Sequence, residues 1–178
     1  MPIAALIEKT TELPEGVTAT IDNGMLSVNG PKGSLTREFR DPKIAMSMNG
    51  NSIVVRAEMP RMREKALVGT WNAHVNNMCK GVTDGFTYHM KLVYSHFPVK
   101  LSVKGDKMVI ENFSGEKSPR FAKIVEGTKV TAKGDSVTIE GIDKEKVGQT
   151  MANIEQATTI RGFDRRVFQD GIYLVSKE

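Results

Sequence analysis

The 178-residue sequence has few of the residues that define several common classes of protein. Its one cysteine, Cys79, excludes an internal disulfide, and a lone thiol fits a reducing intracellular compartment. No apolar run approaches the roughly 20 residues that a membrane-spanning helix needs, and the first residues lack the pattern of a secretory signal. These absences predict a soluble, cytoplasmic protein without a membrane segment.

The sequence also lacks the side chains of a metal centre or a catalytic site. His74 and Cys79 are five residues apart on a predicted helix and do not share a face, while His89 and His96 lie in or beside a predicted strand. No cluster offers the three or four ligands that zinc prefers, and no nucleophile has an orienting partner. We therefore expect no enzyme activity, no metal, no cofactor and no small-molecule substrate.

The positive charge is mild and unevenly distributed. The net charge is +4, and residues 89–178 carry 15 Lys and Arg against 12 Asp and Glu, whereas residues 1–88 carry 10 against 9. Within the second half, residues 100–133 hold eight basic residues and four acids. This asymmetry predicts that the second half does more of any anion binding.

A pattern of turn, strand and helix occurs twice in the chain. Gly50 and Gly134 each stand in a turn before a β-branched strand, and Gly69 and Gly148 each stand in a helical segment with an alanine four residues on. Two copies of such a long unit indicate duplication of a whole small domain. The repeated helical glycines predict close approach between the helix and the sheet.

The predicted fold class is α+β, with two tandem duplicated domains, residues 1–82 and 83–178, each an antiparallel sheet with one helix packed on it. Alternating apolar residues and turn signals predict strands over residues 17–21, 25–28, 35–39, 44–48, 52–58, 87–94, 99–103, 108–110, 121–124 and 137–139 and around residue 130. Helical spacing predicts two apolar faces: Leu67, Trp71, Val75 and Met78, and Val147, Met151, Ile154 and Thr158.

Local signals predict where the first helix begins and ends. Pro60 stands near its start, Gly81 is expected to stop it, and residues 82–85 are expected to form the hinge between the domains. The segment from Thr159 onward has no counterpart in the first half.

Two segments are candidates for anion binding. The loop Gly30–Gly33 places Lys32 between glycines that could cradle a phosphate, although an exposed strand connection is the simpler interpretation. Residues 161–173 combine three arginines with two Phe and a Tyr, a mixture that can bind phosphates and stack on bases. Alternatively, the rings anchor this tail to its own domain while its arginines pair with Asp164, Asp170 or Glu155.

Several short segments of the chain together form a specific pattern: residues 28–35, 69–70, 76–86, 98–99, 141–144, 147–149, 152–154 and 166–173. Through them the chain resembles, over nearly its whole length, the universal large-subunit ribosomal protein number six in its archaeal and eukaryotic form. The bacterial Tyr-Lys-Gly-Lys-Gly type of ending is absent, and the short chain without basic extensions favours the archaeal form. Where Phe163 stands, this branch usually has Lys or Arg.

The resemblance implies a structural, non-catalytic protein of the ribosome that binds large-subunit ribosomal RNA, mainly through its second domain. It implies a place near the sarcin-ricin loop and the stalk base, with neighbouring ribosomal proteins as partners and translation factors nearby. From the basic residues we expect phosphate contacts on one loop and the tail, with Lys32 as a second contact loop. A stand-alone two-domain protein–protein interaction module is the alternative. The expected RNA-binding residues are Lys100, Lys117, Arg120, Arg161, Arg165 and Arg166.

Overall fold

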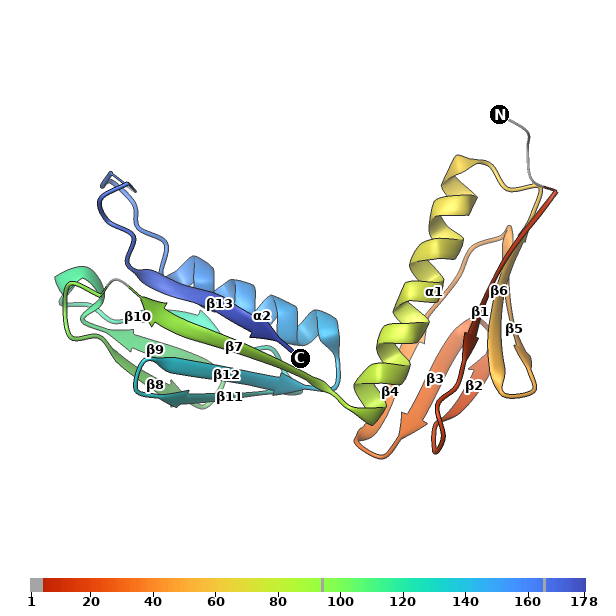
Figure 1. Ribbon diagram of the computed structural model, residues 1–178, viewed down its shortest axis with the longest axis horizontal. Helices are drawn as coiled ribbons and strands as arrows, with labels where there is room; N and C mark the ends of the chain where they lie inside the picture. The colour runs from red at the N-terminus through yellow and green to blue at the C-terminus, as the bar shows by residue number, and fades with distance from the viewer. Residues whose placement is uncertain (1–4, 94, 165) are drawn as a thin grey trace. The chain divides into compact units, whose positions relative to one another are not determined.

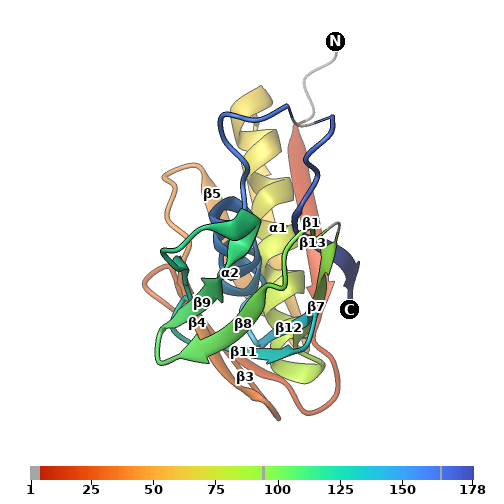
Figure 2. The same cartoon turned by 90° about the vertical axis from the view of Figure 1, so that its left-hand side faces the viewer.

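The computed structural model describes residues 5–93, 95–164 and 166–178, and the chain divides into two compact units, Met1–Gly85 and Phe86–Glu178. Each unit combines antiparallel strands with one long α-helix (Figures 1 and 2). The α+β fold with two tandem domains is therefore as predicted. The predicted boundary at residue 82 falls inside the first helix, and the units divide instead between Gly85 and Phe86.

The first unit has two three-stranded sheets, ordered β1-β6-β5 and β2-β3-β4, and the helix α1. The turn at Asn23 and Gly24, where both residues have positive φ, closes the β2–β3 hairpin, as the sequence predicted. Its elements are β1 (Leu6–Glu12), β2 (Thr18–Asp22), β3 (Met25–Gly30), β4 (Gly33–Glu38), β5 (Ile44–Asn49), β6 (Ser52–Glu58) and α1 (Met62–Thr83).

The second unit has a three-stranded sheet, β10-β9-β8, a four-stranded sheet, β11-β12-β7-β13, and the helix α2. Its elements are β7 (Phe86–Val93), β8 (Lys100–Lys104), β9 (Lys107–Glu111), a 3₁₀ turn η1 (Phe113–Gly115), β10 (Arg120–Lys123), β11 (Thr128–Lys133), β12 (Ser136–Gly141), α2 (Lys144–Ala157) and β13 (Gly171–Lys177).

The two units match strand for strand, which agrees with the duplication read from the sequence. The order β1-β6-β5 corresponds to β7-β12-β11, and β2-β3-β4 corresponds to β8-β9-β10. Ser52 pairs with Glu12, and its counterpart Ser136 pairs with Lys91, so the register of the matching strands is the same. β13 alone has no counterpart, as expected for the tail.

The sequence interpretation missed two strands, β1 and β13. β1 pairs antiparallel with β6, and β13 pairs antiparallel with β7, with a bulge between Leu174 and Ser176. The predicted strand 87–94 is present as β7, and its last residue, Tyr94, lies outside the described residues.

The first helix ends later than predicted. Gly81 is buried inside α1 rather than after it, and the helix continues to Thr83. Gly85 supplies the stop, because its φ of +73° is accessible mainly to glycine and its N–H donates to the carbonyl of Lys80 at 3.1 Å.

The predicted apolar faces of both helices lie against the sheets. Trp71, Val75 and Met78 are buried in the core of the first unit, and Leu67 is partly buried against it. In α2, Val147 and Ile154 are fully buried and Met151 is partly buried. Thr158 caps the end of α2 and is itself buried.

The expected close approach at the helical glycines is wrong. A Cβ atom built on Gly69 or Gly148 would meet no other atom within 4 Å. The close contacts occur instead at strand ends: a Cβ on Gly30 would lie 2.7 Å from Val82 Cγ2, and one on Gly141 would lie 2.7 Å from the Cγ2 atom of Val147. The helices therefore pack closely through β-branched side chains set against strand glycines.

Candidate nucleic-acid interface

Three segments of the second unit meet at one end, and we call this region the loop end: residues 95–99, residues 112–119 and the tail, residues 159–170. The Asn112 side-chain amide donates to the carbonyl of Pro98 at 3.1 Å, and a Cβ on Gly115 would lie 3.2 Å from the Phe97 ring. In Figure 1 the tail projects at this end, between α2 and β13. Segments far apart in the sequence thus form one surface.

Arg120, the first residue of β10, joins these segments. Its guanidinium makes two parallel hydrogen bonds with the Glu116 carboxylate, at 2.8 and 2.6 Å, and its Nη1 donates to the carbonyls of Ala157 and Thr159, both at 3.0 Å. It also lies 4.5 Å from the centroid of the Phe113 ring. The residue ties the loop 112–119 to the last carbonyls of α2 and to the start of the tail.

The Glu116–Arg120 pair is also an electrostatic unit. The hydrogen bond from Arg120 holds the pKa of the Glu116 carboxyl below its usual value, and the same bond raises the pKa of Arg120. Because these contacts engage four of its five N–H groups, Arg120 has little capacity left for a phosphate. Its geometry makes it a positioning residue for its neighbours.

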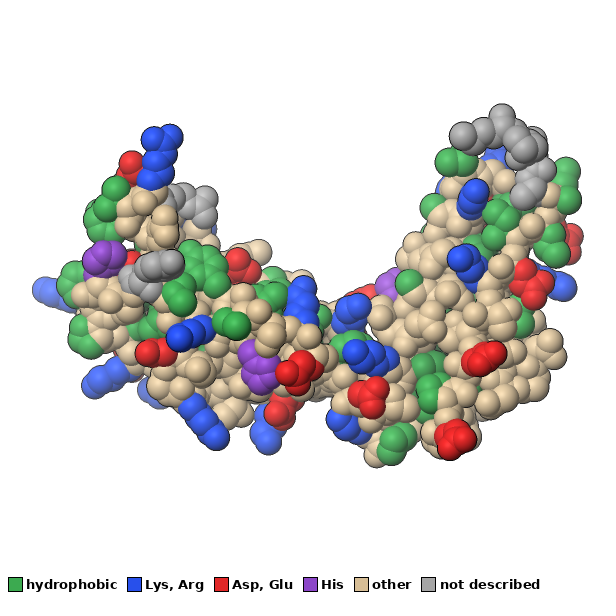
Figure 3. Space-filling model, in the orientation of Figure 1, with side chains coloured by type: hydrophobic (Ala, Val, Ile, Leu, Met, Phe, Trp, Pro, Cys, Tyr) green, Lys and Arg blue, Asp and Glu red, His purple; other side chains and the backbone are tan. Residues whose placement is uncertain are grey.

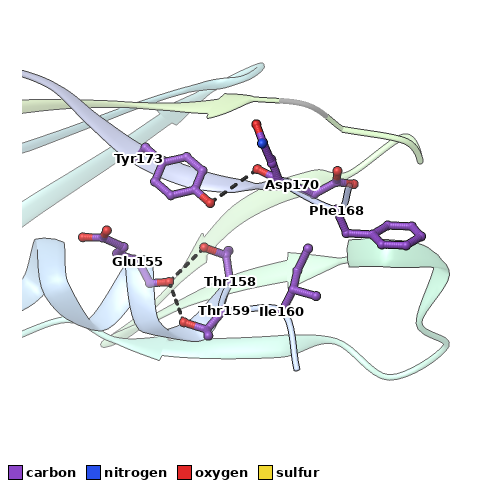
Figure 4. Close-up of a pocket in the computed structure, with 8 residues that line it drawn as sticks. Glu155, Thr158, Thr159, Ile160, Phe168, Asp170 and Tyr173 are labelled. Carbon is purple, nitrogen blue, oxygen red and sulfur yellow. Dashed lines mark hydrogen bonds between the residues drawn. The ribbon is translucent and has the colours of Figure 1, made fainter. Parts of the chain in front are cut away.

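The tail leaves and rejoins the fold at a fixed point. The Thr158 hydroxyl donates to the carbonyl of Glu155 at 3.0 Å and accepts from the N–H of Ile172 at 3.1 Å. Residues 159–171 are thereby closed into a loop whose two ends lie together. Beside this junction is a pocket of about 190 Å³, shown in Figure 4, with the hydroxyl of Tyr173 directed at the carbonyl of Gln169.

The buried side chain of Asp170 holds the C-terminal part of the tail in place. The side chain of Asp170 is only 5% exposed, and its carboxylate lies 2.6 Å from His96 Nδ1 and accepts from the His96 backbone N–H at 3.0 Å. The Phe168 ring contacts the rings of His96 and Phe163, with centroid distances of 5.8 and 5.1 Å. The aromatic residues therefore anchor the tail, which the sequence had offered as one interpretation.

The acids of the tail region do not pair with the guanidinium groups of its described arginines. The Asp164 side chain accepts from the backbone N–H of Arg166 at 2.9 Å, and its carbonyl accepts from the N–H of Phe168 at 2.9 Å. Asp170 is held by His96, and Glu155 is exposed. Among the described residues, no ion pair joins Arg161 or Arg166 to any of these acids.

The basic residues expected to bind RNA are divided between this surface and other places. Lys117, Arg161 and Arg166 are exposed at the loop end, and Lys100 is exposed next to it as the first residue of β8. Within the described ranges the structure gives none of these four side chains a hydrogen bond or ion pair. Arg165 lies outside the described residues. The space-filling view in Figure 3 shows Lys and Arg side chains projecting from this end of the second unit.

Lys32 lies in the first unit and has a local role. Its ammonium donates to the carbonyl of Asp84, and its backbone N–H donates to the carbonyl of Val82 at 2.9 Å. The loop is thereby docked on the C-terminal end of α1, and Gly30 permits this contact because it has no side chain. The geometry matches the simpler interpretation of this loop, an exposed strand connection.

The loop end can bind an extended anion. Lys117, Arg161 and Arg166, which have no side-chain partner among the described residues, stand on a frame fixed by Arg120, Thr158 and Asp170. Lys100 lies next to this frame, and the Phe163 ring is 58% exposed. Such a surface can neutralise phosphates and stack on bases. In the described part of the chain, no three His, Cys, Asp or Glu side chains converge on a possible metal position, and no helix is long and apolar enough to span a bilayer.

Sequence reasoning missed the contacts that hold this surface in shape, and it predicted Arg120 as an RNA contact rather than as a supporting residue. The spacing of four between Glu116 and Arg120 was a usable signal for a local ion pair, because a turn readily brings such residues together. His96 and Asp170 are 74 positions apart, and nothing local in the sequence indicates their contact. The supporting side chains were therefore harder to find than the exposed cations.

Comparisons with known proteins agree with this architecture. The family model described as ribosomal protein L6 matches residues 13–85 and 97–171, one match in each unit. The chain is 53% identical over 178 residues to the large ribosomal subunit protein uL6 of Methanobrevibacter smithii, with both chains covered completely. It is 50% identical over 167 residues to the uL6 protein of Picrophilus torridus, covering 94% of this chain and 93% of that one. Against the uL6 protein of Methanothrix thermoacetophila the identity is 49% over 171 residues, covering 96% and 97%.

Proposed function

The chain belongs to the ribosomal protein L6 family, and from that premise we propose that its second unit binds large-subunit ribosomal RNA through the loop end. The protein is a structural, non-catalytic component of the large ribosomal subunit and acts on the ribosome in the cytoplasm. Its proposed position is near the sarcin-ricin loop and the base of the stalk. Neighbouring ribosomal proteins of the stalk base and passing translation factors are then its other contacts.

The observation that carries the proposal is the set of cations at the loop end that have no partner among the described residues. Acids are present there, yet Glu116 is bound by Arg120 and Asp170 by His96. The remaining basic side chains keep their charge available for phosphates. The cations proposed to touch phosphates are Lys100, Lys117, Arg161, Arg165 and Arg166.

Recognition of this kind depends on the shape of the RNA and the position of its phosphates. Guanidinium groups can bind two phosphate oxygens at once, and the fixed ends of the tail restrict where Arg161 and Arg166 can reach. Exposed Phe163 offers a ring for stacking on a base in a position where it adds no charge. Reading of base edges is a minor part of this mechanism.

Arg120 and Lys32 have indirect roles in this proposal. Arg120 keeps the loop of Lys117 beside the start of the tail, so its loss would misplace cations rather than remove a phosphate contact. Lys32 can reach an RNA phosphate only after its ammonium leaves the carbonyl of Asp84. A contact by Lys32 would therefore be secondary to those of the second unit.

The test is a salt titration of binding to a fragment of large-subunit ribosomal RNA. Each phosphate contact releases about one counterion, so changing Lys117, Arg161 and Arg166 together to Gln should reduce the slope of log K against log salt by about 2–3. The matched control changes Lys104, Lys107 and Lys129 to Gln, since these are exposed in the same unit and Lys104 ends the strand that Lys100 begins. Equal slopes for the two triple variants would contradict the proposal.

The same preparations separate binding from folding. Thermal unfolding of the first triple variant should match that of the unaltered chain, because the described cations changed in it make no side-chain contact that holds the fold. A lowered melting temperature with an unchanged salt slope would instead mean that the tail arginines serve the domain itself. Salt-independent RNA binding by the unaltered chain would reject phosphate recognition altogether.

A further inference from the structure

One edge of the first unit is open where the second unit has a strand. β1 lies at the edge of its sheet and is bonded only to β6 among the described strands. The N–H of Met59 donates to the carbonyl of Ala5 at 2.9 Å, and that of Leu13 donates to the carbonyl of Asn51 at 3.0 Å. Antiparallel pairs alternate, so the odd-numbered residues of β1 bond inward to β6. The backbone groups of Glu8, Thr10 and Glu12 therefore point outward.

In the second unit the corresponding strand edge, that of β7, is paired with another strand, β13. The shared register makes Thr87, His89 and Lys91 of β7 the counterparts of Glu8, Thr10 and Glu12. In β7 these positions face β13, and Thr87 exchanges two hydrogen bonds with Glu178, at 3.0 and 2.8 Å. The same structural position is thus filled by an antiparallel strand in one copy of the domain, and in the other it is unpaired among the residues that the structure describes.

The side chains around the open edge indicate what would fill it. Leu6, Glu8, Thr10 and Glu12 are all exposed and share the face of β1 opposite its core-facing Thr11. Two carboxylates on that face favour basic residues directly across from them. In the second unit Lys91 stands at the position of Glu12, so the sign there is reversed, and Glu178 of the covering segment lies 3.9 Å from His89.

An apolar cluster marks one end of the same edge. Leu6 is 51% exposed, Met59 is 69% exposed and Met62 is 77% exposed. They lie together because Met59 is hydrogen-bonded to the residue before Leu6, and Met62 begins α1. Figure 3 shows hydrophobic side chains at this end of the first unit. Exposed apolar groups beside unpaired backbone are typical of a protein-binding edge.

We propose that an extended basic segment of another large-subunit protein adds to β1 as an antiparallel strand. In this partner segment, the residues opposite Glu12 and Glu8 are Lys or Arg, and the residue opposite Leu6 is apolar. Because the segment runs antiparallel to β1, its sequence from N- to C-terminus has the pattern basic-x-x-x-basic-x-apolar. The two carboxylates disfavour RNA phosphates at this place. The inference rests on the proposed function in one respect, since the partner is sought in the assembled subunit.

The experiment places a photoreactive p-benzoylphenylalanine at Thr10 of the full chain and assembles it into large subunits. Irradiation should cross-link it to a peptide of another ribosomal protein that has the stated pattern, identified by mass spectrometry. The double variant Glu8→Lys/Glu12→Lys, carrying the same probe, should lower the cross-link yield at least fivefold. Its control, Asp22→Lys/Glu38→Lys, makes the same charge change away from β1 and should leave the yield unchanged.

The outcomes separate this inference from the function it rests on. If the probe-bearing chain enters subunits but cross-links to RNA, to a second copy of itself or to nothing, the β1 proposal is overturned and the ribosomal role stands. If the unaltered chain fails to enter subunits, the proposed function is overturned and the inference with it. An equal loss of yield in both double variants would also overturn the proposal, because net charge would then explain the contact.

Discussion

Replacing Gly148 by alanine is expected to raise the free energy of unfolding of the second unit. The residue lies inside α2, and a Cβ atom there would meet nothing within 4 Å. The added methyl group therefore causes no clash, and alanine loses less backbone entropy than glycine when the helix forms. Since glycine is about 1 kcal/mol less favourable than alanine in a helix interior, the expected gain is about 1 kcal/mol.

Differential scanning calorimetry of the full chain measures this gain. For a unit of this size, about 1 kcal/mol corresponds to a rise of about 4–8 °C in the melting temperature. The companion Gly69→Ala should stabilise the first unit similarly, because its site in α1 is equally open. Hydrogen exchange of amides in the two helices assigns each calorimetric change to its unit.

Gly141→Ala is the contrasting variant, because a Cβ atom at this position has no free space. At Gly141 the added Cβ would lie 2.7 Å from the Cγ2 atom of Val147 and 3.3 Å from the carbonyl oxygen of Gly127. Val147 is fully buried and its side chain is stiff, so Gly141→Ala should lower the stability by about 1–3 kcal/mol. If Gly148→Ala lowered the melting temperature as well, α2 would be closer to its surroundings than the described structure has it, and the argument from open space would fail.

Three further predictions concern the loop end and the buried thiol. The pKa of Glu116 is lower in the folded state than its ordinary value of 4.5. Its pairing with Arg120 therefore stabilises the unit fully at a pH above 4.5, and this stabilisation is lost as the pH falls through the lowered pKa. Glu116→Gln should remove this contribution and flatten the pH dependence of the melting temperature in acid. Asp170→Asn should release the tail from His96, seen as new susceptibility of the tail to proteolysis, while α2 keeps its amide protection. Burial raises the pKa of Cys79, so its alkylation at neutral pH should be slow in the folded chain and fast in denaturant; equally fast labelling in both would contradict its burial.

The sequence predicted most of the regular structure because its signals were local. Period-two strands, glycine turns and the spacing of Trp71 and Val75 all arise from neighbouring residues. β1 was missed because only Ile7 and Thr11 turn toward the core, and exposed Lys9 stands between them, so no apolar alternation appears. The duplication was the available signal, since the predicted strand 87–94 opens the second unit and β1 is its counterpart in the first.

The interface could be predicted in part from the sequence. Exposed cations in the tail were evident from their spacing among aromatic residues, but the separation of binding from supporting roles depends on distant partners. Arg120 is held by backbone carbonyls 37 and 39 positions away. Every residue has such a carbonyl, so the sequence gives no sign of which one is used. Gly148 is a different case, because the predicted apolar face of α2 does not include it, and this spacing already argued against a close contact there.

The pairing of β7 with β13 has a consequence for folding during synthesis on the ribosome. Synthesis proceeds from the N-terminus, so all strands of the first unit emerge before β7 does, whereas β7 must wait for residues 171–177 before its outer edge is paired. During that interval the nascent second unit has an unpaired strand of eight residues with buried apolar side chains. Such an edge can pair with other chains, so slow translation or early termination in the tail would leave the newly made chain prone to aggregation.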